Sequence, residues 1–396
     1  MINIIEMKRY YLALVFLIPL SIRAQIITTF AGNGSAVFSG NGGPATAAGI
    51  RDPAGGIFDK NNNYYFADDL PACRIRLINS TGIITTFAGN GSCSFTSDGI
   101  AATASELNSP ATAKIDTQGN VYIADAANNR IRKVTVATEI ITTVAGTGSS
   151  TFGGDGVPAT AASIYNPQDI CLDNSGNLYI ADFWHNRIRK VDAVTGIIMT
   201  VAGGGTSGIG EGGPATAAQL VSPGTVAVDN VGNIYLGEES SSTLSNRVRK
   251  VDASGIITTI AGNGAPYYSG DNIPATAASI SPCRMAFDAY GQLYIADDVN
   301  YRVYKIDLTD TLRLVAGNGT AGDAGDGGAA TAAELNYPAG IAFDTCGNLY
   351  IPEPGNSIIR KIWLDTTCAA VTIDSTSLNT PAIKAAGTGI SIYKKV

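Results

Sequence analysis

Residues 165–203 read YNPQDICLDNSGNLYIADFWHNRIRKVDAVTGIIMTVAG and carry the clearest structural signal in the chain. It contains four short runs rich in Ile, Val, Leu and Tyr, which are DICLD, LYIAD, RIRKV and IIMTVAG. Turns with Asn, Ser or Gly separate the first two and the last two runs, and a short polar loop separates the middle two. Because no sustained 3.6-residue period runs through it, the stretch predicts four short β-strands rather than helices.

The same pattern recurs along the chain. Residues 107–146 read LNSPATAKIDTQGNVYIADAANNRIRKVTVATEIITTVAG and align with the first stretch almost without gaps. A motif A-G-x-G closes each repeat, and it begins at Ala31, Ala88, Ala145, Ala202, Ala261 and Ala316. Repeats of this length with four antiparallel strands are typical of propeller blades and not of helical solenoids.

The two ends of the pattern predict how a ring would close. Residues 26–32 supply a fourth strand without the first three, and residues 338–364 supply three strands without a fourth. We therefore expect residues 26–31 to pair with the strand around Ile358 to Trp363. The result is an all-β, six-bladed β-propeller with four antiparallel strands per blade and with no exposed sheet edge at the point of closure.

Two blocks carry a family resemblance. The segments Gly119–Val134 and Gly176–Val191, of the form GNLYIADxxNNRIRKV, resemble NHL repeats. The longer pattern TVAGxG…GDGxPATAA is similar to that of exported bacterial NHL-repeat proteins, and the resemblance covers residues 26–364. It implies a six-bladed propeller but little about activity, because this family includes binding domains, sensor domains and a few enzymes.

The chain ends indicate three segments: an export signal at residues 1–24, the propeller at 25–364 and a tail at 365–396. Lys8 and Arg9 precede an apolar run, Tyr11 to Leu20, that is too short to span a bilayer as a helix. We therefore expect a protein without a membrane span after signal removal, located outside the cell, at its surface or in the periplasm. The tail ends in GISIYKKV, which is similar to the start of type IX secretion sorting domains; it is either truncated or similar by chance.

The net charge indicates which partners to exclude, and the cysteine content indicates which disulfides to consider. The net charge of −7 becomes more negative once residues 1–24 are removed, which argues against nucleic acid as a partner. An exported protein can form disulfides, and Cys73 with Cys93 and Cys346 with Cys368 are the candidate pairs, because each pair falls on one face of one blade; the connectivity stays open. Cys171 is expected to be a buried thiol.

The direction of the chain sorts the loops by face. Loops between fourth and first strands lie on the same face as loops between second and third strands, and we call this the long-loop face. Long loops on a rigid scaffold often carry function, so we expect the binding surface here. The glycine-rich segment at residues 145–162 resembles a phosphate loop, but its repetition predicts a connector instead.

Residues that recur in most repeats are expected to serve the scaffold. The Asp that ends most second strands and the Arg that opens the third strand predict a loop-closing ion pair, as between Asp182 and Arg187. The recurring aromatics predict packing of the loop on its blade or, alternatively, a ring that stacks sugars; they are Phe38, Phe95, Phe152 and Tyr268. Most long loops also carry an acidic residue, and at the same position in the first loop stands Asn41; the acids are Asp98, Asp155, Asp271 and Asp326. Because calcium needs six to eight oxygen ligands and each loop supplies few, we expect no cofactor and keep calcium as the alternative.

Residues that break the repeat are the candidates for ligand binding, because exposed aromatic and charged departures often mark a binding site. They are Phe183, Trp184, His185, Glu238, Glu239, Tyr267, Tyr268 and Arg284.

We predict a binding or interaction module that engages an extracellular or periplasmic protein or glycan through the long-loop face. The alternatives are a hydrolase- or lyase-type enzyme with its site at the channel mouth, and a purely structural cell-surface scaffold. The enzyme is disfavoured because the starts of the first strands supply only Gln168, Asp169 and Arg284 as strongly polar groups, and the chain has one histidine. We assign no catalytic residue and no metal ligand.

Overall fold

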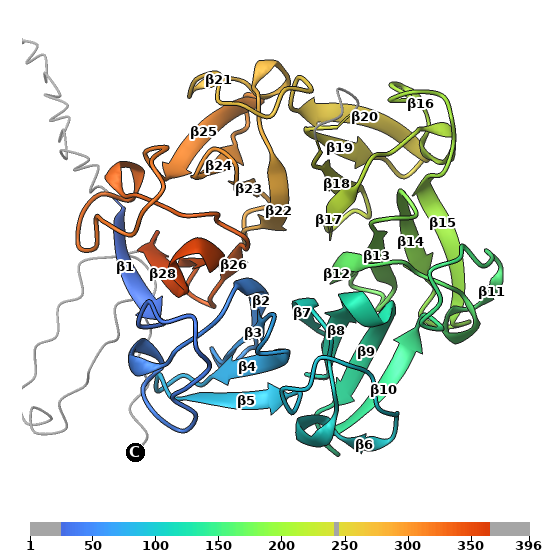
Figure 1. The fold of residues 1–396 in the computed structure, drawn as a ribbon. Helices are drawn as coiled ribbons and strands as arrows, with labels where there is room; N and C mark the ends of the chain where they lie inside the picture. Colours follow the sequence, from blue (N-terminus) through green and yellow to red (C-terminus); the bar gives the residue numbers. More distant parts are fainter. Residues whose placement is uncertain (1–24, 241–244, 365–396) are drawn as a thin grey trace, which may run out of the picture. The chain divides into compact units, whose positions relative to one another are not determined.

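The computed structural model of the protein describes residues 25–240 and 245–364, which form an all-β arrangement of antiparallel sheets placed around a common centre (Figure 1). Within these residues the helical segments are single 3₁₀ turns, and no α-helix occurs. The predicted signal peptide at residues 1–24 and the tail at 365–396 lie outside the described residues, so both stay predictions.

The sheets are built from units of four strands, which run from the channel outward. The first strands are β2 (Pro53–Phe58), β7 (Pro110–Ile115), β12 (Pro167–Leu172), β17 (Pro223–Val228), β22 (Pro282–Phe287) and β26 (Ala342–Phe343). The second strands are β3 (Tyr64–Asp68), β8 (Val121–Asp125), β13 (Leu178–Asp182), β18 (Ile234–Glu238), β23 (Leu293–Asp297) and β27 (Leu349–Glu353). The third strands are β4 (Arg74–Ile78), β9 (Arg130–Thr135), β14 (Arg187–Val191), β19 (Arg247–Val251), β24 (Arg302–Ile306) and β28 (Ile358–Trp363). The fourth strands are β5 (Ile84–Ala88), β10 (Ile140–Ala145), β15 (Ile197–Gly203), β20 (Ile256–Ala261), β25 (Thr311–Ala316) and β1 (Ile26–Ala31). Each unit is named below by its first strand.

The first strand of the described chain pairs with the last. β1 runs antiparallel to β28, with Ile26 opposite Trp363 and Ile27 opposite Ile362. The order of that sheet is β1-β28-β27-β26, so the two ends of the chain contribute to one unit. The loop after β25 reaches the same sheet, because the N–H of Gly327 donates to the carbonyl oxygen of Ile27 at 2.8 Å.

Each long loop fastens one unit to the next. The glycine-rich segment leaves the fourth strand, adds a short edge pairing to the fourth strand of the following unit and then forms an Ala-Thr-Ala 3₁₀ turn. In the β12 unit the edge strand is β11 (Val157–Pro158) and the turn is η4 (Ala159–Ala161). Ala159 accepts a hydrogen bond from Gly146 of the preceding unit and donates one to Gly196 of its own unit. These loops are connectors, as the repetition predicts.

The turns between first and second strands are closed by an aspartate. Asp173 accepts hydrogen bonds from the backbone N–H groups of Ser175 and Asn177, and the side chain of Asn177 donates back to it at 2.7 Å. An aspartate that holds its own turn in this way explains the recurring D-x-x-G-N sequence.

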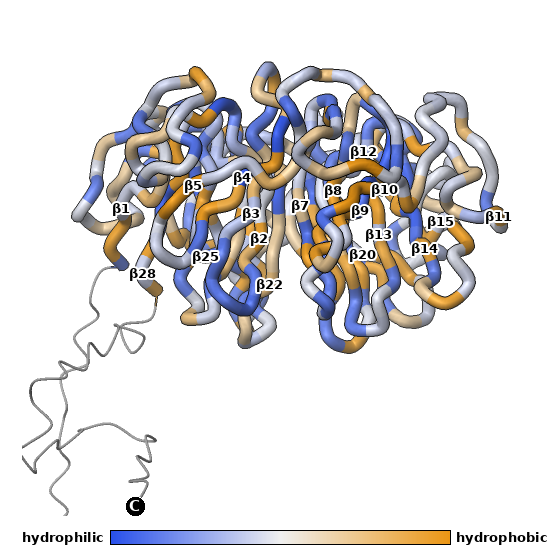
Figure 2. The backbone as a smooth tube through the Cα atoms, turned by 90° about the horizontal axis from the view of Figure 1, so that it is seen from below, coloured by the Kyte–Doolittle hydropathy of each residue, from blue (hydrophilic) through white to orange (hydrophobic). Residues whose placement is uncertain are grey.

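The hydrophobic core lies between consecutive units. One buried cluster joins Ile131 of β9, Ile164 of a long loop, Ile180 of β13 and Ile198 of β15. Burial of each such side chain contributes about 1.5–3 kcal/mol, so the packing of unit against unit stabilises the ring. The edge-on view shows the apolar residues concentrated in the strands, between two rims of more hydrophilic loops (Figure 2).

Candidate binding site

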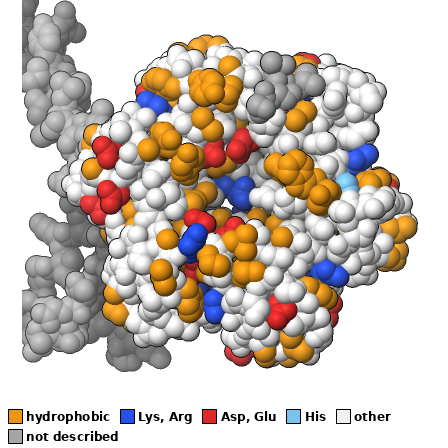
Figure 3. Space-filling view, viewed as in Figure 1, with side chains coloured by type: hydrophobic (Ala, Val, Ile, Leu, Met, Phe, Trp, Pro, Cys, Tyr) orange, Lys and Arg blue, Asp and Glu red, His pale blue; other side chains and the backbone are white. Residues whose placement is uncertain are grey.

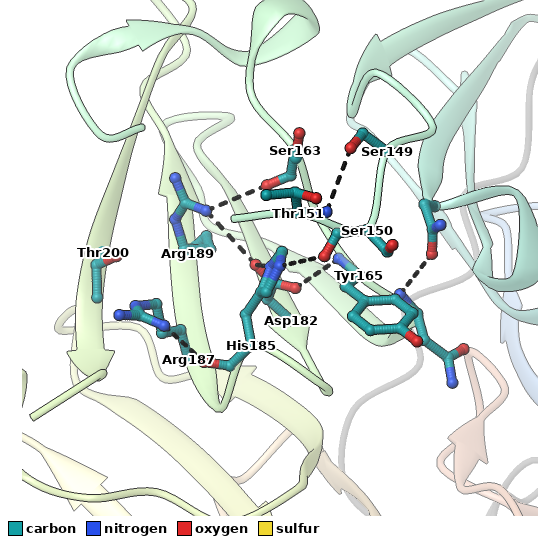
Figure 4. Close-up of polar contacts among 12 residues, drawn as sticks. Ser149, Ser150, Thr151, Ser163, Tyr165, Asp182, His185, Arg187, Arg189 and Thr200 are labelled. Carbon is teal, nitrogen blue, oxygen red and sulfur yellow. Dashed lines mark hydrogen bonds and ion pairs between the residues drawn. The ribbon is translucent and has the colours of Figure 1, made fainter. Parts of the chain in front are cut away.

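The acid that ends each second strand pairs with the second arginine of the third strand. Asp182 lies 3.5 Å from Arg189 (Figure 4), and Arg189 also contacts the loop residue Asp155 at 2.8 Å. The predicted pairing with Arg187 is wrong. Both arginines point to the same side of the strand, but Arg189 lies deeper and is fully buried, so it needs the charged partners. The same pairs recur as Asp68–Arg76, Asp125–Arg132, Glu238–Arg249 and Glu353–Arg360.

The first arginine of each third strand binds the loop instead. Arg187 donates to the carbonyl oxygen of His185 at 2.7 Å and lies over the ring of Phe152 at 4.1 Å. The other recurring aromatics, Phe38, Phe95 and Tyr268, are covered by Arg74, Arg130 and Arg302 in the same way. These contacts support the packing role of the recurring aromatics over the sugar-stacking alternative.

The structure gives His185 a scaffold role. Its Nδ1 lies 2.9 Å from Asp182 and its Nε2 lies 3.0 Å from the carbonyl oxygen of Ser150 (Figure 4). Asn128 makes the equivalent two contacts in the β7 unit, and Asn300 makes them in the β22 unit. His185 therefore substitutes for a recurring asparagine, and we do not retain it in the candidate site.

Trp184 and Phe183 form an aromatic patch on the long-loop face. Trp184 is 53% exposed and meets the ring of Phe183 edge-on at 4.8 Å, with Tyr165 at 6.4 Å. Phe183 and Trp184 stay predicted binding residues, but neither of them lines the pocket described next.

A pocket of about 280 Å³ opens on the long-loop face between the β17 and β22 units. We call it the junction pocket; its lining is Glu239, Ser240, Asn246, Pro266, Tyr267, Ser281 and Val299. It brings together two predicted residues, Glu239 and Tyr267, from two different loops. Glu238 is instead fully buried against Arg249, and Tyr268 is covered by Arg302, so neither lines the pocket.

The repeat conformation is broken at this pocket. The residue before the proline of the first strand has a positive φ in the other units, at Asp52, Ser109, Asn166, Ser222 and Tyr337, but Ser281 does not. The N–H of Ser281 donates to Asp297 rather than to an asparagine side chain. Consequently the Oδ1 of Asn246, a residue only 1% exposed, has no hydrogen-bond partner among the described residues.

A glycine makes this local shift possible. Gly237 occupies the position where the preceding unit has Ala181. A Cβ at Gly237 would lie 2.7 Å from the carbonyl oxygen of Pro282 and 2.6 Å from Thr225, which is too close for carbon. Residue 237 is therefore a site where a neighbouring strand approaches the backbone closely.

Arg284 crosses the central channel beside the pocket. Its guanidinium donates to the carbonyl oxygens of Gly224 and Gln168, both at 3.1 Å, and of Cys283 at 2.8 Å. Basic side chains are visible inside the central opening, with acidic side chains at its rim (Figure 3). Arg284 thus links the inner strands and places a positive charge near the pocket; its predicted contact with a ligand stays a prediction.

Two carboxyl groups meet at the inner end of the pocket. Carboxylate oxygens of Glu239 and Asp298 and the Sγ of Cys283 lie within 4.8 Å of one another. Burial, and then the charge of Asp298, raise the pKa of Glu239 to about 7. Burial also raises the pKa of Asp298, while Arg284 lowers it. The Cys283 thiol donates to the carbonyl oxygen of Pro338 at 3.1 Å, and burial raises its pKa.

Sequence reasoning missed Asn246, Asp298 and Ser281. Asn246 and Asp298 occupy positions where neighbouring repeats have similar residues, so they do not stand out. Two signals were available: Gly237, and Tyr304, which stands where the other units carry the buried arginine.

The larger hollows lie between the turns of the other face. One of about 670 Å³ lies between the β7 and β12 units, and one of about 440 Å³ lies between the β2 and β7 units. Their charged groups are used by the scaffold: Asp116 accepts from the side chain of Asn120 at 2.8 Å, and Lys133 donates to Tyr122 at 3.0 Å. We therefore place the candidate site in the smaller junction pocket.

The loop acids considered for calcium are engaged by protein groups. Asp98 lies 2.9 Å from Arg132, and Asp326 lies 2.7 Å from Arg360. Asp155 binds Arg189 in the same manner. These contacts do not test calcium binding, which stays an alternative.

The cysteines include one described disulfide, between Cys73 and Cys93, with a Cα–Cα distance of 5.4 Å. Cys346 is not a free cysteine, and its predicted partner Cys368 lies outside the described residues. Cys171 is a free thiol that is partly buried rather than fully buried as predicted, and desolvation raises its pKa.

Comparison with known proteins supports the fold. Residues 165–191 match the NHL repeat. Protein SUPPRESSOR OF QUENCHING 1, chloroplastic, of Arabidopsis thaliana is 27% identical over 259 residues, covering 62% of this chain and 24% of that protein. Mouse Teneurin-4 is 27% identical over 279 residues, covering 62% of this chain and 10% of that protein. The chain thus spans a quarter or less of the length of these relatives.

A solved structure of an auxiliary nutrient binding protein from Bacteroides thetaiotaomicron superposes with a TM-score of 0.62. It is 17% identical, and the match covers 86% of this chain and 76% of that one. Residues 165–191 thus match one NHL repeat, and the fold of the described residues is that of this solved structure. None of the helices among the described residues is long and apolar enough to cross a membrane.

Proposed function

We propose that this chain is a ligand-binding module whose binding site is the junction pocket on the long-loop face. The observation that carries the proposal is the Oδ1 of Asn246, which has no hydrogen-bond partner among residues 25–240 and 245–364 and is held at 1% exposure in the wall of a pocket where the repeat conformation is broken. A buried acceptor without a partner costs about 1–3 kcal/mol, so its persistence favours a bound group that donates to it. A propeller that bound no ligand here would be more stable if Asn246 accepted a backbone hydrogen bond, as the equivalent asparagines of the β7 and β12 units do.

The proposal includes a six-bladed ring closed by the N-terminal strand. Support comes from the pairing of β1 with β28 and from the hydrogen bond between Gly327 and Ile27. Such a ring holds the loops of two units rigidly against each other, which a pocket shared by two units requires. Deletion of residues 25–31 is expected to expose the edge of β28 and to cause aggregation; a monomeric, folded deletion variant would contradict closure.

The sequence and the relatives support a proposal for the location and the partner of the protein. We propose that the protein acts outside the cytoplasm, in line with the expected export signal and the disulfide between Cys73 and Cys93. The similarity to an auxiliary nutrient binding protein and to teneurins agrees with a binding role for the propeller. The partner is an extracellular or periplasmic protein, glycan or smaller molecule.

Thermal denaturation of the purified protein with a library of sugars, anions and organic cations tests the binding role. A ligand at 100 times its Kd stabilises by about 2.7 kcal/mol, which a melting curve resolves. Tyr267→Ala removes the exposed rim of the pocket, and Tyr290→Ala is the matched control, because Tyr290 is 85% exposed on the other face of the same unit. We expect a ligand that stabilises the wild type and Tyr290→Ala but not Tyr267→Ala. The same stabilisation of all three proteins, or none by any compound, would overturn the proposal.

A further inference from the structure

The junction pocket offers acceptors to its ligand. In the β7 and β12 units the asparagine equivalent to Asn246 accepts a backbone hydrogen bond: Asn129 accepts from Asn166 and Asn186 accepts from Ser222, both at 2.8 Å. The Nδ2 of Asn246 donates to the carbonyl oxygen of Ser240 at 2.7 Å and to that of Gly264 at 3.4 Å, the second as Asn129 donates to Gly148. Only the acceptor end of this amide is left for a ligand, so the complementary group is a hydrogen-bond donor.

The charge beside this acceptor is negative. Glu239 lines the pocket, and Asp298 interacts directly with it at the inner end. The neighbouring positive group is Arg284, whose Nη1 and Nη2 already donate to main-chain oxygens of the inner strands. One arginine faces two carboxyl groups, and with a pKa of about 7 Glu239 is only partly ionised at neutral pH. A positively charged ligand favours the ionised form of Glu239, whereas an anion disfavours it.

The rim of the pocket provides an aromatic surface. Tyr267 is 75% exposed and stands beside Pro266 at the opening. Aromatic rings attract ammonium and guanidinium groups through their π faces, and arginine–aromatic stacking already recurs on this face of the ring. A volume of about 280 Å³ is small for a whole drug-sized ligand but sufficient for the charged end of one.

We propose that the junction pocket binds an organic cation, an ammonium or guanidinium group that donates to Asn246 and Glu239 and lies against Tyr267. This inference rests on the proposed function, because it names the ligand class of that same site. The group can come from a free amine or from the lysine or arginine side chain of a partner protein. In both cases the acidic protein, with a net charge of −7, attracts it.

Isothermal titration calorimetry of the purified protein tests the ligand class. The probes are butylamine and butylguanidine, their neutral counterpart butyramide, and N-acetyl-lysine methylamide, whose amine belongs to a side chain. We expect both small cations to bind and butyramide not to bind. Tighter binding of the lysine derivative than of butylamine identifies a protein side chain as the source, and equal binding identifies a free amine.

Two matched variants locate the binding. Glu239→Gln keeps the shape of the pocket and removes its charge, and Glu106→Gln makes the same change in a loop of the β7 unit. We expect Glu239→Gln to weaken cation binding at least tenfold and Glu106→Gln to leave it unchanged. Equal loss in both variants, no binding of any cation, or binding of Ca²⁺ or Zn²⁺ in place of organic cations would overturn the inference. If another ligand stabilises the protein through Tyr267 in the thermal screen, the cation inference fails while the binding function stands; if none does, both fail.

Discussion

Asp297 provides the sharpest test of the physical reasoning, because its buried carboxyl lacks the arginine that other units supply. Tyr304 stands at the position where other units carry the arginine. Burial, and then the charge of Asp298, raise the pKa of Asp297 to about 8, although hydrogen bonds from Asn300 and Ser281 act to lower it. Asp297→Asn replaces it with a neutral side chain of the same shape. The variant should therefore remove one specific contribution to the pH dependence of stability.

The direction of the pKa shift of Asp297 determines whether the free energy of unfolding rises or falls with pH. The folded-state pKa of Asp297 is above the value of about 3.9 expected in the unfolded chain, so the folded state holds its proton more tightly. The stabilisation is complete below about pH 4 and is lost as the pH rises toward 8. Since one pKa unit corresponds to about 1.4 kcal/mol, Asp297 should lower the free energy of unfolding by about 3–4 kcal/mol between pH 5 and pH 8.

Urea denaturation followed by tryptophan fluorescence at pH 5 and pH 8 measures this difference. We expect Asp297→Asn to lose less stability than the wild type over this interval, by about 3 kcal/mol. The control is Asp182→Asn, which breaks a buried ion pair with Arg189 and should cost about 3 kcal/mol at both pH values. An identical pH dependence in Asp297→Asn and the wild type would refute the reasoning, because Asp297 would then be ionised in the folded protein at neutral pH.

Three further substitutions test the scaffold. His185→Asn should leave the melting temperature nearly unchanged, because asparagine makes the same two contacts in other units, whereas His185→Ala should cost about 1–3 kcal/mol; equal losses in thermal denaturation would contradict the equivalence. Gly237→Ala should destabilise by about 1–3 kcal/mol through the clash with Pro282, and unchanged urea denaturation would show that β22 can move away. Cys73→Ser with Cys93→Ser should cost about 3 kcal/mol, as expected for a closed loop with a sequence separation of 20, and dithiothreitol should lower the melting temperature of the wild type but not of the double variant.

The repeat made the strands predictable, since each of them recurs with the same turn chemistry. Residues 165–203 and 107–146 align almost without gaps, and their strands and turns coincide in the structure. Ion pairing was less predictable, because a strand period of two places Arg187 and Arg189 on the same side, and only burial selects between them. The alternation of side chains along a strand predicts the face on which a residue lies, but not how deeply it is buried.

The candidate site was predictable only where a residue departs from the repeat. Glu239 and Tyr267 were found for that reason. Asn246 was missed because an asparagine at its position is ordinary, as Asn129 and Asn186 demonstrate; its altered role arises from the backbone conformation of the distant Ser281. A change of partner without a change of residue type leaves no mark in the sequence.

The central claim is that the break in the repeat between the β17 and β22 units is a binding site for an organic cation. A crystal structure of the protein grown with N-acetyl-lysine methylamide tests it most directly. The account predicts the ammonium group within hydrogen-bond distance of the Oδ1 of Asn246 and a carboxylate oxygen of Glu239, with the ligand beside Tyr267. Ligand bound only elsewhere on the ring, with Asn246 paired to a protein group instead, would contradict it.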